Sequence, residues 1–227
     1  MSLADNARNL LSSSGRRDRR RDRRPILAKS KLRRLAHTEL PAGTISLARY
    51  LLGKVVVRDL PGGMTVGRIV ETEAYLQNDA ACHAFRGPTP RNRSLFLRRG
   101  HAYVYIAYGT SMMLNVAGSR HGVGEGVLIR ALEPIEGVTE MEARRGVTRH
   151  LDLTRGPGRL AQAFAIDLTL DGIDLCAPGP LWLASDGRRR GAVGESTRIG
   201  LTKDAHRVLR FYLRGNPHVS GPKKLSP

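Results

Sequence analysis

Residues 67–75 read Gly-Arg-Ile-Val-Glu-Thr-Glu-Ala-Tyr, and this stretch decides how we interpret the rest of the chain. Its β-branched residues predict a strand, in which residues two apart share a face. One face is then expected to carry Ile69, Glu71, Glu73 and Tyr75, and the other Val70, Thr72 and Ala74. Two interpretations are open: the paired carboxylates form the floor of a site, or they lie on an exposed, solvated face.

The residues before this strand predict a helix and a hairpin. Thr44 is expected to cap a short helix over residues 45–52, which ends at Gly53. Residues 54–60 predict a second strand. The Pro-Gly-Gly sequence at 61–63 then turns the chain into the strand at 67–75, which completes a β-hairpin.

The chain after residue 100 predicts several further short elements. Strands are expected at 101–108, 112–117, 126–132, 181–183, 197–202 and 208–213, and helices at 139–145 and 159–166. Short Gly- and Pro-rich turns between neighbouring strands favour antiparallel pairing. We therefore expect an α+β fold: a single mixed domain over residues 39–220, mainly antiparallel β-sheet with short helices and a protruding β-hairpin.

The charge of the chain is strongly positive and unevenly distributed. The 227 residues include 38 Lys and Arg against 20 Asp and Glu, a formal net charge of +18. The first 36 residues hold 12 of the basic and 3 of the acidic residues, so the remainder is also basic. A field of this sign favours a polyanionic partner, most often nucleic acid. The arginine run at 16–24 predicts a disordered basic arm over residues 1–38, and residues 221–227 predict a loose tail.

Composition also argues against several classes of protein. No apolar run approaches the ~20 residues that a membrane span needs, and we expect no secretory leader. The two cysteines, Cys82 and Cys176, lack a metal-type spacing, which favours a reducing compartment and argues against zinc. We expect a monomer without cofactor, metal or membrane association, located in the cytoplasm at the nucleoid, or in the nucleus of a eukaryote.

Two basic loops are candidates for contacts with phosphates. The long loop at 76–100 carries five arginines among Gly, Pro and Asn, including Arg91 and Arg93. Such a loop suits phosphate contacts, and a solvated surface loop is an equal alternative. Gly158 lies in a Gly-Pro-Gly approach to the helix at 159–166, where free N–H groups could hold a phosphate. A plain helix start is the stronger interpretation there.

Four of the six tyrosines are grouped: Tyr75, Tyr103, Tyr105 and Tyr108. Aromatic side chains beside basic loops are what base stacking requires, and a tyrosine-lined core is the alternative. If these phenol groups are buried they need hydrogen-bond partners, which Glu73 or His83 could supply. Tyr108 sits at the mouth of a predicted hairpin turn, where core packing explains a large aromatic least well.

Arg130 interrupts an otherwise apolar strand. A buried arginine is rare unless a carboxylate pairs with it, so we expect Arg130 beside Glu71 or Glu73. The sequence contains no phosphate-binding loop with Gly-Lys-Ser/Thr, no paired-cysteine zinc signature, no His-Glu-x-x-His and no nucleophile elbow. A carboxylate that acts as base or nucleophile remains, with aromatic side chains that hold a flat substrate.

Five motifs in chain order closely resemble the 3-methyladenine (alkyladenine) DNA glycosylase family of the mammalian type. They are Arg-Ile-Val-Glu-Thr-Glu-Ala-Tyr (68–75), Thr-Pro-Arg-Asn-Arg (89–93), Tyr-Val-Tyr-Ile-x-Tyr-Gly (103–109), Leu-Ile-Arg-Ala-Leu-Glu-Pro (128–134) and Arg-Phe-Tyr-Leu-Arg-Gly (210–215). The resemblance runs from about residue 47 to residue 220, and motifs of this length in this order are highly specific.

This resemblance implies a monofunctional enzyme that flips a nucleotide out of duplex DNA and excises alkylated or deaminated purines. Glu73 would be the general base that activates water, and Arg130 would hold the carboxylate and the water. The resemblance assigns the base pocket to Tyr75, His83, Tyr103, Tyr105, Asn115 and Leu128. Tyr108 would fill the gap left by the flipped base. Base flipping costs a few kcal/mol, which an aromatic wedge offsets in part.

The chain departs from the family pattern in two places. Thr110 and Ser111 are smaller than the Met-Tyr of the mammalian wedge hairpin, so a weaker grip on the opposite strand is expected. The loop between His83 and Thr89 is one residue shorter. Arg86 therefore has no matched counterpart, and Arg91 and Arg93 carry over as DNA-backbone contacts by their position in the motif at 89–93. Gly158 is a candidate backbone contact from its Gly-rich helix start alone.

Two other functions are open on the residues. A carbohydrate-active glycoside hydrolase could use Glu71 and Glu73 as an acid/base pair, which would need an acidic cleft and carboxyls roughly 5–10 Å apart. A noncatalytic DNA- or RNA-binding module would not need the Glu73 carboxylate. The positive charge argues against the first, and the motifs argue against both.

Overall fold

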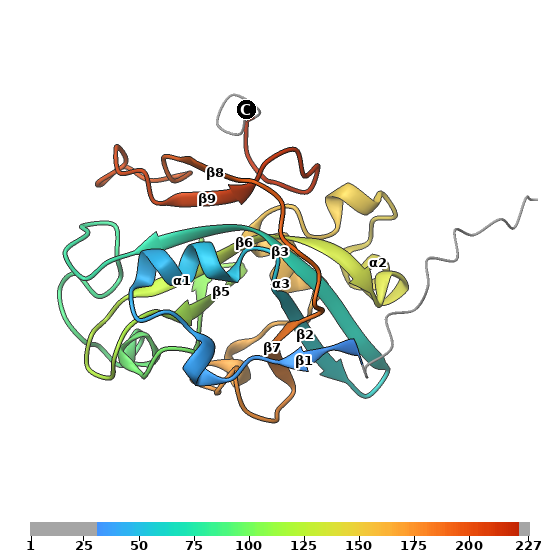
Figure 1. Ribbon diagram of the computed structural model, residues 1–227, viewed down its shortest axis with the longest axis horizontal. Helices are drawn as coiled ribbons and strands as arrows, with labels where there is room; N and C mark the ends of the chain where they lie inside the picture. The colour runs from blue at the N-terminus through green and yellow to red at the C-terminus, as the bar shows by residue number, and fades with distance from the viewer. Residues whose placement is uncertain (1–30, 223–227) are drawn as a thin grey trace, which may run out of the picture.

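The structure, a computed structural model, describes residues 31–222 as one antiparallel sheet with short helices packed against it (Figure 1). The strands are β1 (Arg33–Arg34), β2 (Val55–Leu60), β3 (Gly63–Tyr75), β4 (Ala102–Ala107), β5 (Ser111–Ala117), β6 (Gly126–Glu136), β7 (Leu181–Ser185), β8 (Val193–Ser196) and β9 (Arg210–Leu213). The helices are α1 (Thr44–Leu51), α2 (Val138–Arg145) and α3 (Pro157–Ala163). Single turns lie at His37–Glu39, Arg93–Phe96, His150–Asp152 and Leu168–Leu170. The predicted α+β class is confirmed.

The sheet runs in the order β1-β7-β2-β3-β6-β5-β4, and β9 pairs with both β3 and β8. All of these pairings are antiparallel. The hairpin β2–β3 forms as predicted around the Pro-Gly-Gly turn, and so does the hairpin β4–β5. Strand β3 is the centre of the architecture because β2, β6 and β9 all pair with it.

Helix α1 covers one face of the sheet. Its residues Leu47, Leu51 and the following Leu52 are buried, and the Thr72 hydroxyl of β3 donates to the Ala48 carbonyl at 3.0 Å. The predicted capping role of Thr44 is wrong, because Gly43 is the N-cap. The Thr44 hydroxyl instead donates to Glu125 at 2.5 Å, which ties α1 to the β5–β6 connection.

The strict two-residue alternation predicted for β3 is interrupted at its centre. The register with β6 pairs Ile69 with Leu132 and then Glu71 with Ala131, so Val70 has no partner on β6. The next pair joins Thr72 to Ile129, which leaves Arg130 of β6 without a partner on β3. Such bulges re-aim side chains, and here they direct Arg130 toward the two carboxylates.

Two segments differ from their predictions. The arm predicted over residues 1–38 is corrected for residues 31–38, because β1 pairs with β7 and Leu35 is fully buried. Residues 1–30, and residues 223–227 of the predicted tail, lie outside the described residues. The strand predicted at 197–202 lies earlier, at Val193–Ser196, because the Ile199 N–H binds the Glu73 carboxylate and not a neighbouring strand. Within residues 31–222, no helix is long and apolar enough to cross a bilayer.

Gly67 allows β3 and the end of α3 to approach closely. A Cβ atom at this position would lie 2.8 Å from Cζ of Phe164 and 3.0 Å from Cβ of Leu132, both in the core. We therefore predict that Gly67→Ala destabilises the protein by about 1–3 kcal/mol, the usual cost of overpacking. Urea unfolding measures the change. Gly62→Ala is the matched control, because a Cβ there meets nothing within 4 Å, and equal effects of the two substitutions would contradict the prediction.

Candidate active site

An aromatic pocket of about 310 Å³ opens at one end of the sheet. It lies between the loop after β3, the hairpin β4–β5 and the segment 197–204. Its lining residues are Tyr75, Ala81, Cys82, His83, Arg91, Leu95, Tyr103, Tyr105, Ile106, Ala107, Tyr108, Asn115, Gly126 and Leu201. The size and the aromatic walls suit a flat, ring-shaped ligand.

The pocket wall is built from stacked rings that hold one another in place. The rings of Tyr103 and Tyr105 lie 5.3 Å apart and stack at 28°, as expected for residues two apart on β4. The His83 ring meets Tyr105 edge-on at 4.4 Å, and its Nδ1 lies 2.8 Å from the Tyr103 hydroxyl. The Asn92 amide donates to the His83 carbonyl at 2.9 Å and so fixes the loop that carries this histidine.

These rings are neutral at physiological pH. Burial lowers the pKa of His83, and the nearby Arg91 lowers it further. Burial raises the pKa of Tyr105 to about 12 and raises the pKa values of Tyr75 and Tyr103 as well. A neutral imidazole places no positive charge against the ligand, so the pocket can accept a cationic ring without repulsion from His83.

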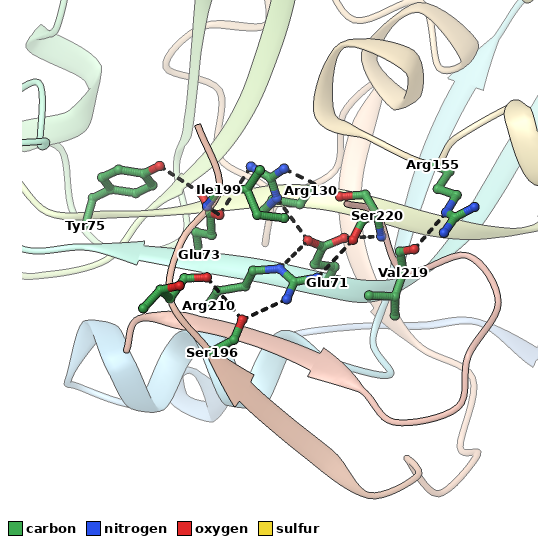
Figure 2. A network of polar contacts seen from close by, with 11 residues as sticks. Glu71, Glu73, Tyr75, Arg130, Arg155, Ser196, Ile199, Arg210, Val219 and Ser220 are labelled. Atoms are coloured by element: carbon green, nitrogen blue, oxygen red, sulfur yellow. Dashed lines mark hydrogen bonds and ion pairs between the residues drawn. The ribbon is translucent and has the colours of Figure 1, made fainter. Parts of the chain in front are cut away.

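The Glu73 carboxylate is fully buried behind Tyr75, which lines the pocket, and Glu73 itself is not among the lining residues. Its Oε2 accepts from the Tyr75 hydroxyl at 2.8 Å, and its Oε1 accepts from the Ile199 N–H at 2.8 Å. Arg130 Nη1 lies 3.2 Å from the same Oε1 (Figure 2). Burial raises the pKa of Glu73, and these three partners act in the opposite direction. An orientated carboxylate with a raised pKa is well suited to act as a general base.

The second carboxylate, Glu71, is held in a structural network. Its Oε1 accepts from Arg210 Nε at 2.7 Å and from Arg130 Nε at 3.0 Å, and its Oε2 accepts from the Ser220 N–H at 2.6 Å (Figure 2). Glu71 and Arg210 are both fully buried, and Glu71 does not line the pocket. The solvated-face interpretation is therefore wrong, and the two carboxylates have different partners.

The segment 197–204 closes the pocket and is anchored by a buried ion pair. Both side chains of the Arg198–Asp79 pair are fully buried, and Arg198 donates to both carboxylate oxygens. Arg198 also donates to the Ala74 carbonyl at 3.0 Å, and its guanidinium lies 4.6 Å from the centre of the Tyr75 ring. The next residue, Ile199, binds Glu73. The pair thus positions both the wall and one partner of the carboxylate.

A basic groove adjoins the hairpin turn that carries Tyr108. Tyr108 is 86% exposed, has a positive φ of 53° and lies at the rim of the aromatic pocket. Gly158, in the first turn of α3, contacts this hairpin, since a Cβ on it would lie 3.1 Å from Ser111. The groove is lined by both residues together with Arg145, Arg155 and Arg159.

The other predicted site residues differ in whether they line the aromatic pocket. Asn115 lines the pocket and donates to the Tyr103 carbonyl at 3.2 Å. Leu128 is buried and pairs with both Asn115 and Glu73 in the sheet, but it is not among the lining residues. Arg91 lines the pocket and donates to the Ile106 carbonyl at 2.8 Å. Arg93 is exposed at the start of the turn Arg93–Phe96 and is not brought to the pocket.

Several residues that build the candidate site were not identified from the sequence. Arg198 and Ile199 lie in a segment predicted as a strand, and Arg210 was noted for its motif and not as a partner of Glu71. Asp79 and Arg198 are 119 residues apart, so no local pattern indicates that they pair. The prediction that Glu73 or His83 partners buried phenols is confirmed by the hydrogen bonds Tyr75–Glu73 and Tyr103–His83. Arg130, expected beside Glu71 or Glu73, pairs with both.

Within residues 31–222, one group of side chains is of metal-ligand type: His37, Asp174 and Cys176, whose ligand atoms lie within 4.8 Å of one another. The His37 Nε2 lies 2.9 Å from Asp174 Oδ2, and its Nδ1 lies 3.1 Å from the Arg99 carbonyl oxygen. These polar groups satisfy one another, and none of the three residues lines the aromatic pocket.

Comparison with known proteins shows the family to which the chain belongs. A family model described as methylpurine-DNA glycosylase (MPG) matches residues 39–217. The chain is 66% identical over 191 residues to a "Putative 3-methyladenine DNA glycosylase" of Mesorhizobium japonicum, covering 84% of this chain and 92% of that protein. Proteins with the same name from Paraburkholderia phytofirmans and Methanoculleus marisnigri are 49% and 45% identical. These alignments cover 84% and 78% of this chain, and 90% and 93% of the relatives.

These relatives are bacterial and archaeal. They support the family that the motifs indicated and do not support its mammalian type.

The buried Arg198–Asp79 pair generates a prediction. Arg198→Met leaves the Asp79 carboxylate buried without its cation, and removal of one partner of such a pair costs about 3–5 kcal/mol. We expect this loss in urea unfolding. Arg149→Met is the control, because the Arg149 side chain is 72% exposed and its ion pair with Asp152 spans one turn, so its loss is expected to stay below about 1 kcal/mol. Similar small losses for both variants would show that the pair does not anchor the segment.

Proposed function

The chain belongs to the methylpurine-DNA glycosylase family, and from this premise we propose how its residues carry out the reaction of a DNA glycosylase. The protein is a hydrolase of N-glycosyl bonds that acts in DNA repair, and damaged DNA is its substrate. The proposal concerns the residue roles and the class of base. It assigns alkylated or deaminated purines, flipped out of duplex DNA, to the aromatic pocket.

Glu73 is the general base of this proposal. The observation that carries it is a fully buried carboxylate whose oxygens are orientated by Tyr75, Ile199 and Arg130 beside a pocket of purine size. The carboxylate removes a proton from water as the water attacks C1′ of the sugar, and the base leaves with the bonding electrons. Arg130 holds the carboxylate in place and stabilises its ionised form. Glu71 cannot serve as a second acid, because two guanidiniums and an N–H occupy its oxygens.

The pocket rings recognise the flipped purine by stacking. Tyr105, Tyr75 and the neutral His83 present flat faces and edges to a ring, which matches the requirements of base binding. A positively charged alkylpurine is already a good leaving group, so it meets no repelling imidazolium and needs little help to depart. Asn115 in the pocket wall supports a role in rejecting normal guanine, whose 2-amino group adds bulk at the ring edge.

Tyr108 is the residue that we assign to the gap in the duplex. Its exposure at the hairpin tip fits a side chain that enters the groove and replaces the flipped base in the stack. The groove beside it offers three arginines and the N-terminus of α3 at Gly158 to the DNA backbone. We assign further backbone contacts to Arg91, which lines the pocket, and to the exposed Arg93. All of these groups come from one chain, which supports action as a monomer.

We predict that Glu73→Gln abolishes single-turnover release of hypoxanthine or ethenoadenine from a duplex, while binding of that duplex is retained. The amide keeps the size of the side chain but cannot accept the proton from water. Base release is measured after alkaline cleavage of the abasic site, and binding by fluorescence anisotropy.

Glu140→Gln on α2 is the matched control, because it makes the same carboxylate-to-amide change and Glu140 lines neither the aromatic pocket nor the groove beside Tyr108. If wild type and Glu73→Gln release base at equal rates, Glu73 is not the base. If neither releases hypoxanthine, ethenoadenine or methylated bases while both bind the duplex, a noncatalytic binding module replaces the proposal.

A second prediction concerns pH. Burial raises the pKa of Glu73 above its ordinary value of 4.5, and the base must be ionised, so the rate on a neutral lesion falls as pH drops through a midpoint above 4.5. The positive charge of Arg130 lowers this pKa, so Arg130→Gln is expected to move the midpoint to higher pH. Single-turnover rates on hypoxanthine between pH 4 and 9 give the profile, and a midpoint unchanged in Arg130→Gln would contradict the assignment.

A further inference from the structure

A second basic groove, of about 640 Å³, lies away from the aromatic pocket, and we call it the back groove. It is lined by Ser46, Arg49, Tyr50, Leu52, Gly53, Lys54, Arg188, Arg189 and Arg190. These residues come from α1, from the residues that follow it, and from the segment that joins β7 to β8. In Figure 1 this joining segment crosses β2 and β3 on the side of the sheet that carries α1.

The back groove and the catalytic carboxylate are on opposite faces of the sheet. Thr72 points toward α1, where its hydroxyl bonds the Ala48 carbonyl, while Glu71 and Glu73 on either side of it point the other way. Strand β9 repeats this pattern. Phe211, which pairs with Thr72, lies 4.9 Å beneath the guanidinium of Arg49, whereas its neighbour Arg210 reaches Glu71.

The positive charge of the back groove is in excess. Its lining contains four arginines and one lysine and no acidic residue. Two acids lie beside it: Glu195 is 2.9 Å from Arg49, and Asp186 is 2.5 Å from the buried Arg68 and 3.8 Å from Arg188. Five basic side chains of the lining therefore face two acids, one of which is shared with Arg68. The Arg188 side chain is 67% exposed. This surface attracts a polyanion, and its arginines and lysine are the side chains that contact phosphates.

Strand β1, which consists of Arg33 and Arg34, pairs with the strand that precedes the arginines of this groove. Strand β1 pairs with the end of β7, with Arg33 opposite Ser185, and the three arginines 188–190 follow directly after β7. Residues 1–30, which precede β1 in the chain, contain 9 basic and 3 acidic residues. The described basic residues Arg33 and Arg34 therefore lie beside the strand from which the segment with arginines 188–190 continues.

We propose that the back groove binds the phosphate backbone of a second segment of nucleic acid while the catalytic face holds the lesion. The sheet separates the two faces, so a stretch of duplex whose base occupies the aromatic pocket does not supply the phosphates for the groove. The proposal rests on the proposed function for the catalytic face. Binding in the groove is independent of sequence, because side chains of this kind read backbone charge and not base edges.

With such a site the enzyme has two separate binding sites for DNA. When the catalytic face releases a duplex without a lesion, the back groove keeps the protein on a neighbouring segment, and the front face can then bind that region. The attraction is electrostatic, so it weakens with salt by about 0.9 in log K per log[salt] for each phosphate contact.

The test is co-capture of two duplexes by the full-length chain. A biotinylated 15-mer with one ethenoadenine is immobilised, Glu73→Gln protein is added below saturation, and a fluorescent undamaged 15-mer follows at about 50 mM salt. We expect the second duplex to be captured, and we expect Arg188→Glu/Arg189→Glu in the same background to reduce capture at least fivefold. Single-turnover excision of a 15-mer by the double variant with Glu73 intact is expected to stay within twofold of wild type. Arg120→Glu, an exposed arginine outside the groove, is the matched control.

The outcomes separate this proposal from the proposed function. Absence of excision by the wild-type protein would overturn the glycosylase assignment of the front face and would be seen before any groove variant is tested. Capture of the second duplex that is unchanged in the double variant would overturn the back groove as its site. Parallel loss of excision and capture would place these arginines in the primary DNA site, which also overturns the proposal.

Discussion

The buried ion network around Glu71 is the interaction on which the rest of the structure depends. This carboxylate of β3 binds Arg130 of β6, Arg210 of β9 and the backbone of Ser220. A buried charge without a partner is costly, so these three segments hold their relative positions only while all the groups stay together. The network therefore fixes the part of β3 on which Glu73 lies, two residues further along the same strand.

The same packing explains why two neighbouring glutamates behave differently. Glu71 has a full set of charged partners, whereas Glu73 shares Arg130 and otherwise accepts from one phenol and one backbone N–H. Burial raises the pKa of Glu73 against these weaker partners. The β6 bulge at Arg130 lets one guanidinium serve both carboxylates, and so the structural network and the chemistry share one residue.

Local patterns in the sequence predicted several features of the fold and the site correctly. The hairpins, the face shared by Tyr103 and Tyr105, and the burial of Arg130 beside acids follow from alternation and from the cost of an unpaired charge. The Arg198–Asp79 pair and the role of the Ile199 N–H depend on contacts between residues more than 100 positions apart. The pairing of β1 with β7 was not predicted, because Arg33 and Arg34 belong to the basic segment that was interpreted as a disordered arm.

Net charge predicted the kind of partner but not the surface that meets it. Arg130, Arg198 and Arg210 lie closest to the chemistry, and buried carboxylates neutralise them, so they position groups and contribute little to the external field. The field that DNA encounters arises from exposed arginines in the loop after β3, beside the Tyr108 hairpin and in the back groove. Arginines that are paired with buried carboxylates build the site, and exposed arginines attract its substrate. The number of arginines alone does not distinguish these two groups.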